Sequence, residues 1–386
     1  MKVAIDVLNQ SPDFATGLLS LYVQLARNLP DRSTDIKYLF ASAWEDVEYY
    51  QSKSSKIRVC GAGWGNRHRL LRVFSEHFIL GSALKKEAPD IVLHCGGGIA
   101  PIHFPQKAKL ILAIWGMHHL DQGEITISQR LYRHILFQHS LNRADVVLVN
   151  SQYTKDILCK NYKNISAPIV KIYHGVDLTL FFPDAASSTS RKSLNKFGIS
   201  DKFILFVGQI YPYKLLHILV EGYCKLVHKE RIKHKLLVVG SFAKMHGSGS
   251  GYHNMIVKIL TRHNLIDQVV FVENVTLADL RAFYSLADLY VQPSSSETFG
   301  RTVIEAMACG CPVLAAHAAA TPEILGDAGW YYETKSSDDC ASKMGELLMD
   351  TTAREFCTAK GIERAKMFSF EQEMTELISL FRSMKQ

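Results

Sequence analysis

Two glutamates stand eight positions apart in the segment SSSETFGRTVIEAMACGCPVLA, residues 294–315. Glu297 lies in a Ser-rich loop that follows an apolar run, and Glu305 lies in an Ala-rich stretch typical of a helix. At the start of such a helix, the free backbone N–H groups of residues 299–303 and the helix dipole favour an anion. Gly300 allows the backbone to approach that anion closely. The pattern suits a diphosphate flanked by two polyol groups, with hydrogen bonds to Glu305 from a ribose and to Glu297 from a sugar.

A purely local explanation exists for one of these carboxylates. Thr302 and Glu305 have the S/T-x-x-E spacing of a capping box, in which the glutamate would cap its own helix. Glu297 precedes the helix, so its alternative role is that of a solvated loop carboxylate. On spacing alone, both explanations stay open.

A second segment, FILFVGQIYPYKLLHILVEGY, reads as a strand, a turn and a helix. Gly208 ends the strand, Pro212 shapes the turn, and Lys214 lies where the turn meets the helix. A lysine there can pair with a diphosphate as a point charge. The alternative is an exposed turn lysine.

Apolar runs alternate with helical stretches along nearly the whole chain of 386 residues. Such runs predict strands of parallel sheets covered on both faces, and two series of them predict an α/β protein with two Rossmann-like doubly wound domains. The Ser-, Thr- and Pro-rich stretch 174–200 marks the boundary. We therefore expect domains over residues 1–180 and 181–368. The amphipathic segment 369–386 is expected to form a C-terminal helix.

Charge and composition limit the classes of binding partner that we expect. Residues 1–180 carry 21 Lys and Arg against 15 Asp and Glu, whereas the remainder carries 23 against 22. A basic first half suits an anionic partner, although it is equally compatible with a merely soluble surface. No dense basic stripe with interleaved aromatic residues indicates nucleic acid. No apolar run reaches the length of a membrane span, and the first residues lack the pattern of a signal peptide, so we expect a cytoplasmic protein. The eight scattered cysteines predict buried, reduced thiols.

Together these segments resemble the retaining glycosyltransferases of the two-Rossmann (GT-B) fold, family-4 type. The strongest match is E-x7-E within ETFGRTVIEAMACGCPVLA. Supporting matches are FVGQIYPYK, ADLYVQPS, TPEILGDAGWYY, RADVVLVNSQYTKDIL and KIYHGVDLTLFFP. The resemblance covers nearly the whole chain, and the motifs occur in the family's order.

The resemblance implies transfer of a hexose from a UDP- or GDP-sugar donor to a hydroxyl of a glycan or lipid-linked acceptor, with retention at the anomeric carbon and no cofactor. Glu297 would contact the donor hexose, Glu305 the ribose, and Lys214 the diphosphate. The rest of the donor site would consist of Gly208, Gln209, Thr298, Phe299, Gly300, Arg301 and Thr302. The C-terminal helix would cross back to the first domain, and the two domains would face each other across a cleft.

The first domain would hold the acceptor. The family's glycine-containing loop after the first strand corresponds to NQSPDFATG, which ends at Gly17. The family's histidine near the reacting sugar has Trp115 at its position here. His118 and His119 follow within one turn, and we favour His118 as the catalytic group. A histidine pair that only packs at a strand end is an equally good interpretation.

The donor segment departs from the family pattern at charged positions. The family often has an arginine where Gln209 or Tyr213 stands, and an apolar residue where Arg301 stands. Because a cation at a helix start opposes the dipole, we hypothesise that Arg301 supplies the missing charge. A solvated arginine is the alternative.

The motifs also bear on the mechanism. No D-x-D motif, which commonly binds a divalent cation in other glycosyltransferases, occurs in the chain. We expect Lys214, Arg301 and the helix start to stabilise the leaving diphosphate without a bound metal. The resemblance implies front-face attack rather than the double displacement of retaining glycosidases, whose two carboxyl groups lie about 5 Å apart.

Competing interpretations are a sugar-nucleotide epimerase on the same fold and a non-catalytic nucleotide-sugar-binding subunit. A dehydrogenase is disfavoured, since no G-x-G-x-x-G follows the first strand. The stretch from Arg67 to Lys86 interleaves basic residues with Leu70, Leu71, Val73, Phe74 and Phe78. It fits a helix approaching the inner face of a membrane, or one packed on its own sheet.

Overall fold

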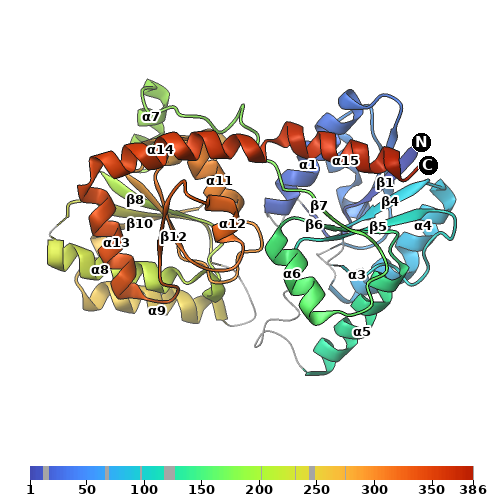
Figure 1. Cartoon of the computed structure of the whole chain (residues 1–386), viewed down its shortest axis with the longest axis horizontal. Helices are drawn as coiled ribbons and strands as arrows, with labels where there is room; N and C mark the ends of the chain where they lie inside the picture. The colour runs from blue at the N-terminus through green and yellow to red at the C-terminus, as the bar shows by residue number, and fades with distance from the viewer. Residues whose placement is uncertain are drawn as a thin grey trace. The chain divides into compact units, whose positions relative to one another are not determined.

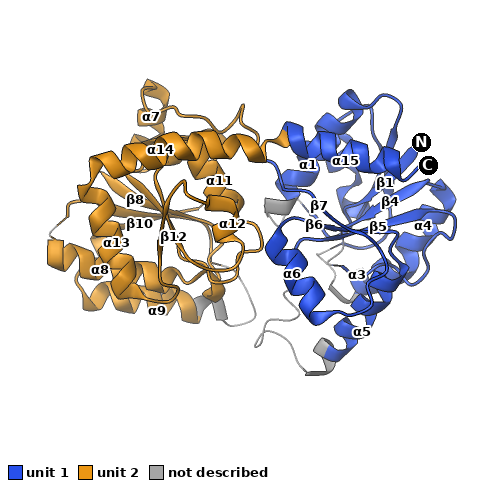
Figure 2. Cartoon of the chain, viewed as in Figure 1, with its two compact units in different colours: residues 1–175, 371–386 blue, residues 176–370 orange. Residues whose placement is uncertain are grey.

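The computed structural model describes residues 1–385 except 12–16, 66–68, 96–97, 117–126, 201, 231, 243–247 and 274 (Figure 1). The chain forms two compact units, one of residues 1–175 with 371–386 and one of residues 176–370 (Figure 2). The boundaries predicted from the sequence lie after residues 180 and 368 instead. The last helix, α15 (Phe370–Ser383), thus runs almost entirely in the first unit, which is here called unit 1.

Unit 1 is built on a seven-stranded parallel sheet with the order β3-β2-β1-β4-β5-β6-β7. Its strands are β1 (Lys2–Asp6), β2 (Lys37–Ser42), β3 (Arg58–Gly61), β4 (Ile91–His94), β5 (Lys109–Ile114), β6 (Val146–Val149) and β7 (Ile169–Lys171). Its other helices include α1 (Gly17–Arg32), α2 (Val47–Gln51), α3 (Arg69–Phe74), α4 (Leu80–Glu87), α5 (Ile127–Arg143) and α6 (Gln152–Asn161). One π-helical turn, Ser75–Ile79, joins α3 to α4.

Unit 2, residues 176–370, is built on a six-stranded parallel sheet with the order β10-β9-β8-β11-β12-β13. Its strands are β8 (Phe203–Val207), β9 (Lys235–Val239), β10 (Val269–Val272), β11 (Leu289–Gln292), β12 (Val313–Ala316) and β13 (Trp330–Tyr332). Its helices include α7 (Ser188–Lys196), α8 (Leu216–Glu230), α9 (Ser248–Arg262), α10 (Leu277–Leu286), α11 (Arg301–Ala308), α12 (Thr321–Leu325), α13 (Ser337–Met349) and α14 (Thr351–Ala365). The sequence prediction of two doubly wound parallel-sheet domains is confirmed.

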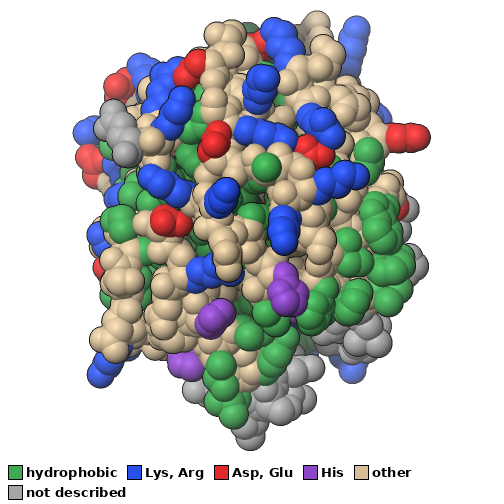
Figure 3. Space-filling model, turned by 90° about the vertical axis from the view of Figure 1, so that its right-hand side faces the viewer, with side chains coloured by type: hydrophobic (Ala, Val, Ile, Leu, Met, Phe, Trp, Pro, Cys, Tyr) green, Lys and Arg blue, Asp and Glu red, His purple; other side chains and the backbone are tan. Residues whose placement is uncertain are grey.

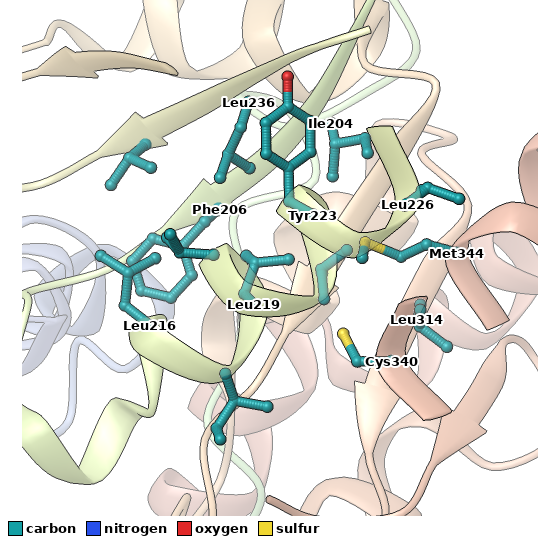
Figure 4. Close-up of a cluster of buried hydrophobic side chains, with 14 of the residues drawn as sticks. Ile204, Phe206, Leu216, Leu219, Tyr223, Leu226, Leu236, Leu314, Cys340 and Met344 are labelled. Atoms are coloured by element: carbon teal, nitrogen blue, oxygen red, sulfur yellow. The ribbon is translucent and has the colours of Figure 1, made fainter. Parts of the chain in front are cut away.

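Each unit has a hydrophobic core of its own. In unit 2, Leu216, Leu219 and Tyr223 of α8 point toward β8 and β9, while Cys340 and Met344 approach from α13 (Figure 4). In unit 1, a separate cluster joins the strands to α4, α5 and α6. Because α8 and α13 are anchored in this way, the loops at the carboxyl ends of β8 and β11 start from fixed positions.

The C-terminal helix completes the core of unit 1. The apolar stripe expected from the sequence is buried at Phe370, Met374, Leu377, Ile378 and Phe381. Leu380 is only partly buried, because it lies at the edge of the buried stripe. The helix therefore supplies part of the core of unit 1.

Candidate functional site

A strand, a loop and a helix position the two glutamates. Strand β11 ends at Gln292, and helix α11 begins at Arg301. Between them, Gly300 is the N-cap residue with φ of 93°, a conformation that glycine adopts without strain. This geometry leaves the first backbone N–H groups of α11 at the carboxyl end of a parallel strand, where an anion is favoured.

The capping-box interpretation of Glu305 is wrong. The helix begins one residue before Thr302, and no side chain caps it. Thr302 instead lies in the first turn, with its Oγ1 2.9 Å from the hydroxyl of Tyr290. The carboxylate of Glu305 accepts a hydrogen bond from the hydroxyl of Tyr284 at 3.1 Å. Local helix capping therefore does not account for a glutamate at position 305.

The side chain of Glu305 is buried, and this changes its acidity. Burial raises the pKa of its carboxyl group above the ordinary value, while the charge of Arg301 and the hydroxyl of Tyr284 partly counteract that rise. A buried carboxyl group with few local partners is costly for stability, so it is a good candidate for a binding role.

Lys214 and Glu297 meet in one ion pair, although 83 positions separate them. Lys214 ends the 3₁₀ turn Pro212–Lys214 after β8, and its ammonium group contacts Oε2 of Glu297. Both side chains are only 17% exposed. The same Oε2 accepts a hydrogen bond from Nε2 of Gln292 at 3.3 Å. The two loops predicted from separate motifs thus converge.

Backbone contacts support the convergence of these loops. The carbonyl of Tyr213 accepts a hydrogen bond from the N–H of Ser295 at 3.4 Å. Gly208 has φ of 153°, and its carbonyl oxygen lies 2.0 Å from the position a Cβ would take on Gly240. The loop that carries Gln209 therefore leaves β8 against the end of β9, in a space that admits no side chain at position 240.

Phe299 and Thr298 complete the loop before α11. The side chain of Phe299 is buried, and its ring lies edge-on to that of Phe368 at 6.0 Å. The carbonyl of Glu297 accepts a hydrogen bond from the N–H of Ala320 at 3.0 Å. The buried ring of Phe299 and this backbone hydrogen bond therefore fix the loop between β11 and α11.

The acceptor residues expected in unit 1 are only partly described. Trp115 directly follows β5, and its indole N–H donates to the hydroxyl of Tyr22 at 2.7 Å. Its ring lies edge-on to His174 at 4.4 Å. Gly17 begins helix α1. His118 and His119 lie outside the described residues, so their role remains a prediction.

Unit 1 contains a buried pair that sequence reasoning missed. Asp6 and His94 are cross-strand neighbours at the carboxyl ends of β1 and β4, with His94 Nδ1 2.8 Å from Asp6 Oδ2. Burial lowers the pKa of His94, but the hydrogen bond and charge of Asp6 outweigh it, so the pKa is raised. A polar residue at the end of each apolar run was the available sequence signal.

Sequence reasoning also missed the buried polar groups beneath α11. Gln292 is a polar residue at the end of the apolar run DLYVQPS, and that contrast could have identified it. Tyr284 has no comparable signal, since its contact with Glu305 depends on how α10 packs against α11.

Among the described residues, no group of three or more His, Cys, Asp or Glu side chains is placed to hold a metal ion. In the same part of the chain, no helix combines the length and the apolar character needed to cross a bilayer.

Two family models together match most of the chain. The model of glycosyltransferase family 4 matches residues 17–180, and the model of glycosyl transferases group 1 matches residues 189–364. The second match contains the loops of Lys214 and Glu297, and the first contains Trp115.

Curated relatives share parts of the sequence. A D-inositol 3-phosphate glycosyltransferase of Corynebacterium aurimucosum is 28% identical over 282 residues, which are 71% of this chain and 64% of that protein. The O-antigen chain mannosyltransferase B of Escherichia coli is 30% identical over 180 residues, 47% of this chain and 45% of that protein. The chain thus spans about half to two thirds of the length of these relatives.

Solved structures share the fold over nearly the full length. The sucrose-phosphate synthase of Thermosynechococcus elongatus superposes with a TM-score of 0.82 at 20% identity, covering 99% of this chain and 98% of that one. Anabaena HepE, solved in complex with UDP and glucose, gives 0.77 at 19% identity, covering 99% and 100%. At these identities the likeness concerns the fold.

Proposed function

The chain belongs to the family-4 type of GT-B glycosyltransferases, and from this premise we propose that it is a retaining hexosyltransferase. It would move a hexose from a UDP- or GDP-sugar to a hydroxyl of a glycan or lipid-linked acceptor. The observation that carries this proposal is the convergence of Lys214, Glu297 and the start of α11 at the carboxyl ends of β8 and β11. Ligands of open parallel sheets bind at such ends.

Each group in this arrangement has a distinct task toward the donor. Lys214 and the first N–H groups of α11 bind the diphosphate. Glu297 accepts from hydroxyls of the hexose, and Glu305, one turn into the helix, accepts from the ribose. In the structure the ammonium group of Lys214 pairs with Glu297. A diphosphate therefore competes for Lys214 and leaves Glu297 for the sugar.

The same groups act on the reaction. As the bond between the anomeric carbon and the diphosphate breaks, negative charge grows on the leaving oxygen. Lys214, Arg301 and the dipole of α11 stabilise that charge without reorganisation. The acceptor hydroxyl attacks from the face that the leaving group departs from, and the leaving phosphate takes its proton. This chemistry retains the anomeric configuration and uses no bound metal.

The acceptor side of the proposal rests on unit 1 and on the relatives. The two curated relatives named above are named for an inositol phosphate and an O-antigen chain. We place the acceptor near Gly17, Trp115, His118 and His119, with His118 closest to the reacting sugar. Assembly of a cell-surface polysaccharide or a lipid-linked oligosaccharide on the cytoplasmic face of a membrane is the matching context.

A helical face of unit 1 supports contact with that membrane. Leu71, Phe74 and Phe78 are 43%, 51% and 41% exposed, and exposed Ser82 and Lys85 continue the same side of the helical run. The rings of Phe74 and Phe78 lie 5.1 Å apart. Packing on the sheet does not account for these side chains. Figure 3, which faces unit 1, shows hydrophobic side chains gathered at the lower right and Lys and Arg above.

Donor and product analysis tests the enzymatic proposal. The purified protein is incubated with a panel of UDP- and GDP-hexoses and a lipid-linked glycan acceptor, and release of nucleoside diphosphate is measured. We expect release that requires acceptor and persists in EDTA, with a product of retained anomeric configuration by NMR. A new sugar nucleotide formed without acceptor would show an epimerase, and a bound donor without turnover would show a binding subunit.

Vesicle flotation tests the membrane proposal separately. The protein should float with phosphatidylcholine vesicles that contain phosphatidylglycerol, and less so at high salt, because the anionic attraction is screened. Replacing Phe74 and Phe78 by Ser should abolish flotation, whereas Phe356→Ser, at a 53% exposed phenylalanine of unit 2, should not. Equal flotation of both variants would contradict this membrane surface.

A further inference from the structure

Beneath the start of α11, a row of buried polar groups leads from the helix to Glu297. Thr302 Oγ1 lies 2.9 Å from the hydroxyl of Tyr290, and that hydroxyl lies 3.4 Å from Oε1 of Gln292. Nε2 of Gln292 then lies 3.3 Å from Oε2 of Glu297. Tyr290 is 0% and Gln292 1% exposed, so water does not substitute for these contacts.

The chemistry of the groups fixes the direction of these hydrogen bonds. The amide nitrogen of Gln292 only donates, and a carboxylate such as Glu297 only accepts. The amide oxygen of Gln292 therefore faces the hydroxyl of Tyr290 as an acceptor, at 3.4 Å. The shorter contact of that hydroxyl is its donation to Oγ1 of Thr302 at 2.9 Å. The amide of Gln292 therefore links the hydroxyl of Tyr290 to Oε2 of Glu297.

Only one of the two carboxylate oxygens of Glu297 accepts these hydrogen bonds. Lys214 and Gln292 both donate to Oε2. Within the described part of the chain, Oε1 accepts no hydrogen bond. The carboxylate is thereby held by one oxygen and presents the other.

We propose that Gln292 and Tyr290 are positioning residues that hold Glu297 with Oε1 turned to a hydroxyl of the donor hexose. This inference rests on the proposed function. Neither residue touches the donor, and both act through Glu297. Loss of either one leaves Glu297 poorly oriented, so recognition of the hexose weakens while recognition of the nucleotide stays.

Tyr284 provides the matching support for the other carboxylate. Its hydroxyl donates to Oε2 of Glu305 at 3.1 Å, and its side chain is fully buried. The rings of Tyr284 and Tyr290 lie edge-on at 5.7 Å, yet the hydroxyl of Tyr284 contacts Glu305 and that of Tyr290 contacts Thr302 and Gln292. The hexose and ribose carboxylates therefore have separate supports.

Calorimetric titration distinguishes the support of Glu297 by Gln292 from the support of Glu305 by Tyr284. Full-length protein is titrated with the nucleotide sugar that binds best among UDP-glucose and GDP-mannose, and with the corresponding UDP or GDP. Gln292→Leu should raise the Kd of the nucleotide sugar about tenfold, typical of a lost hydrogen bond to a charged group, and leave that of the free nucleotide unchanged. Tyr284→Phe should raise both Kd values by the same factor.

Two further variants exclude a merely structural effect. Tyr223→Phe removes a buried hydroxyl that donates to the carbonyl of His234 at 2.7 Å, elsewhere in unit 2. It should lower Tm without changing either Kd. Gln292→Glu places a second carboxyl group beside Glu297, so hexose recognition should be lost while nucleotide recognition is kept.

The outcomes distinguish this inference from the proposed function. A Gln292→Leu protein that loses nucleotide and nucleotide sugar affinity equally, or neither, overturns the positioning role while the transferase proposal stands. A wild-type protein that binds no nucleotide or nucleotide sugar overturns both.

Discussion

At the residue scale, Arg301 is the least expected charge in the proposed donor site. It occupies the first position of α11, where a cation opposes the helix dipole, and its charge lowers the pKa of Glu305 against the effect of burial. A guanidinium group at the start of α11 and next to Glu305 is explained if it binds an anionic ligand.

Arg301→Ala should therefore weaken nucleoside diphosphate binding roughly ten- to a hundredfold, the range for a lost charge-assisted hydrogen bond. Arg301→Lys should restore part of it. Arg191→Ala removes an exposed arginine of α7 as a control. Titration calorimetry measures each Kd, and an Arg301→Ala value equal to that of the wild type would show a solvated arginine.

Glu305 should lower stability at neutral pH. Because burial raises its pKa in the folded state, the folded protein holds a proton that the unfolded chain releases, and stability falls as pH rises through the folded pKa. Glu305→Gln should stabilise unit 2 by about 1 kcal/mol at pH 8 and by less at pH 5, at the expense of donor binding. Urea denaturation at both pH values measures this, and destabilisation at pH 8 would refute it.

His94 has the same pH dependence for a different reason. Its pKa is raised mainly because the hydrogen bond and charge of Asp6 outweigh burial. The stability from this pair is fully present below about pH 6.5 and is lost as pH rises through the folded pKa. His94→Gln should flatten the fall in unit 1 stability between pH 6 and 9. An unchanged slope would mean that His94 stays neutral.

The sequence predicted the convergence of Glu297 and Lys214 better than it predicted their surroundings. Glu297 and Lys214 each follow an apolar run, and parallel strand ends meet at one edge of a sheet, so their convergence could be anticipated. The capping box misled because S/T-x-x-E spacing does not determine where a helix starts. That start depends on Gly300, and the hydroxyl bonded to Glu305 comes from α10.

At the scale of the element, the start of α11 depends on one backbone conformation. Gly300 has φ of 93°, and a Cβ there would lie 3.4 Å from Cγ of Glu297. A methyl group at position 300 would therefore fit without a clash. The positive φ, however, strains any residue that has a side chain.

Gly300→Ala should cost about 1–2 kcal/mol and weaken nucleotide binding further, because the loop shifts to relieve the strain. Gly251→Ala in helix α9 is the control. No atom lies within 4 Å of its Cβ position, so it should stabilise the protein by roughly 0.5–1 kcal/mol. Urea denaturation and calorimetry report both effects. An equal gain from both substitutions would rule out strain at Gly300.

Elements with strong hydrophobic periodicity could be predicted from the sequence, and weakly patterned ones could not. The parallel strands and α15 follow directly from their apolar runs. Helix α7 begins inside a stretch without a strong period, because the hydroxyl of Ser187 caps it by accepting from the N–H of Thr189. Which side of residues 71–85 is exposed also depends on tertiary packing, so the sequence pattern alone could not predict it.

At the scale of the whole molecule, two separate cores predict two unfolding steps. Trp44, Trp64 and Trp115 lie in unit 1 and Trp330 in unit 2, so a Trp330→Phe variant reports unit 1 alone by fluorescence. Nucleotide at a hundredfold excess over its Kd should stabilise unit 2 by about 2.7 kcal/mol and move its calorimetric transition. The fluorescence transition of the Trp330→Phe variant should stay in place. A shift of both transitions would show that the units unfold together.

The chain enters unit 2 at Val176 and returns to unit 1 after Phe370, where Glu373 meets His174 and the N–H of Gly175 in a buried contact. Unit 1 therefore lacks Met374 and Phe381 of its core until residues 371–386 have been translated. On the ribosome, the second unit can finish folding while the first still exposes an apolar groove. The nascent first unit would be the part of this protein that depends on chaperones during synthesis.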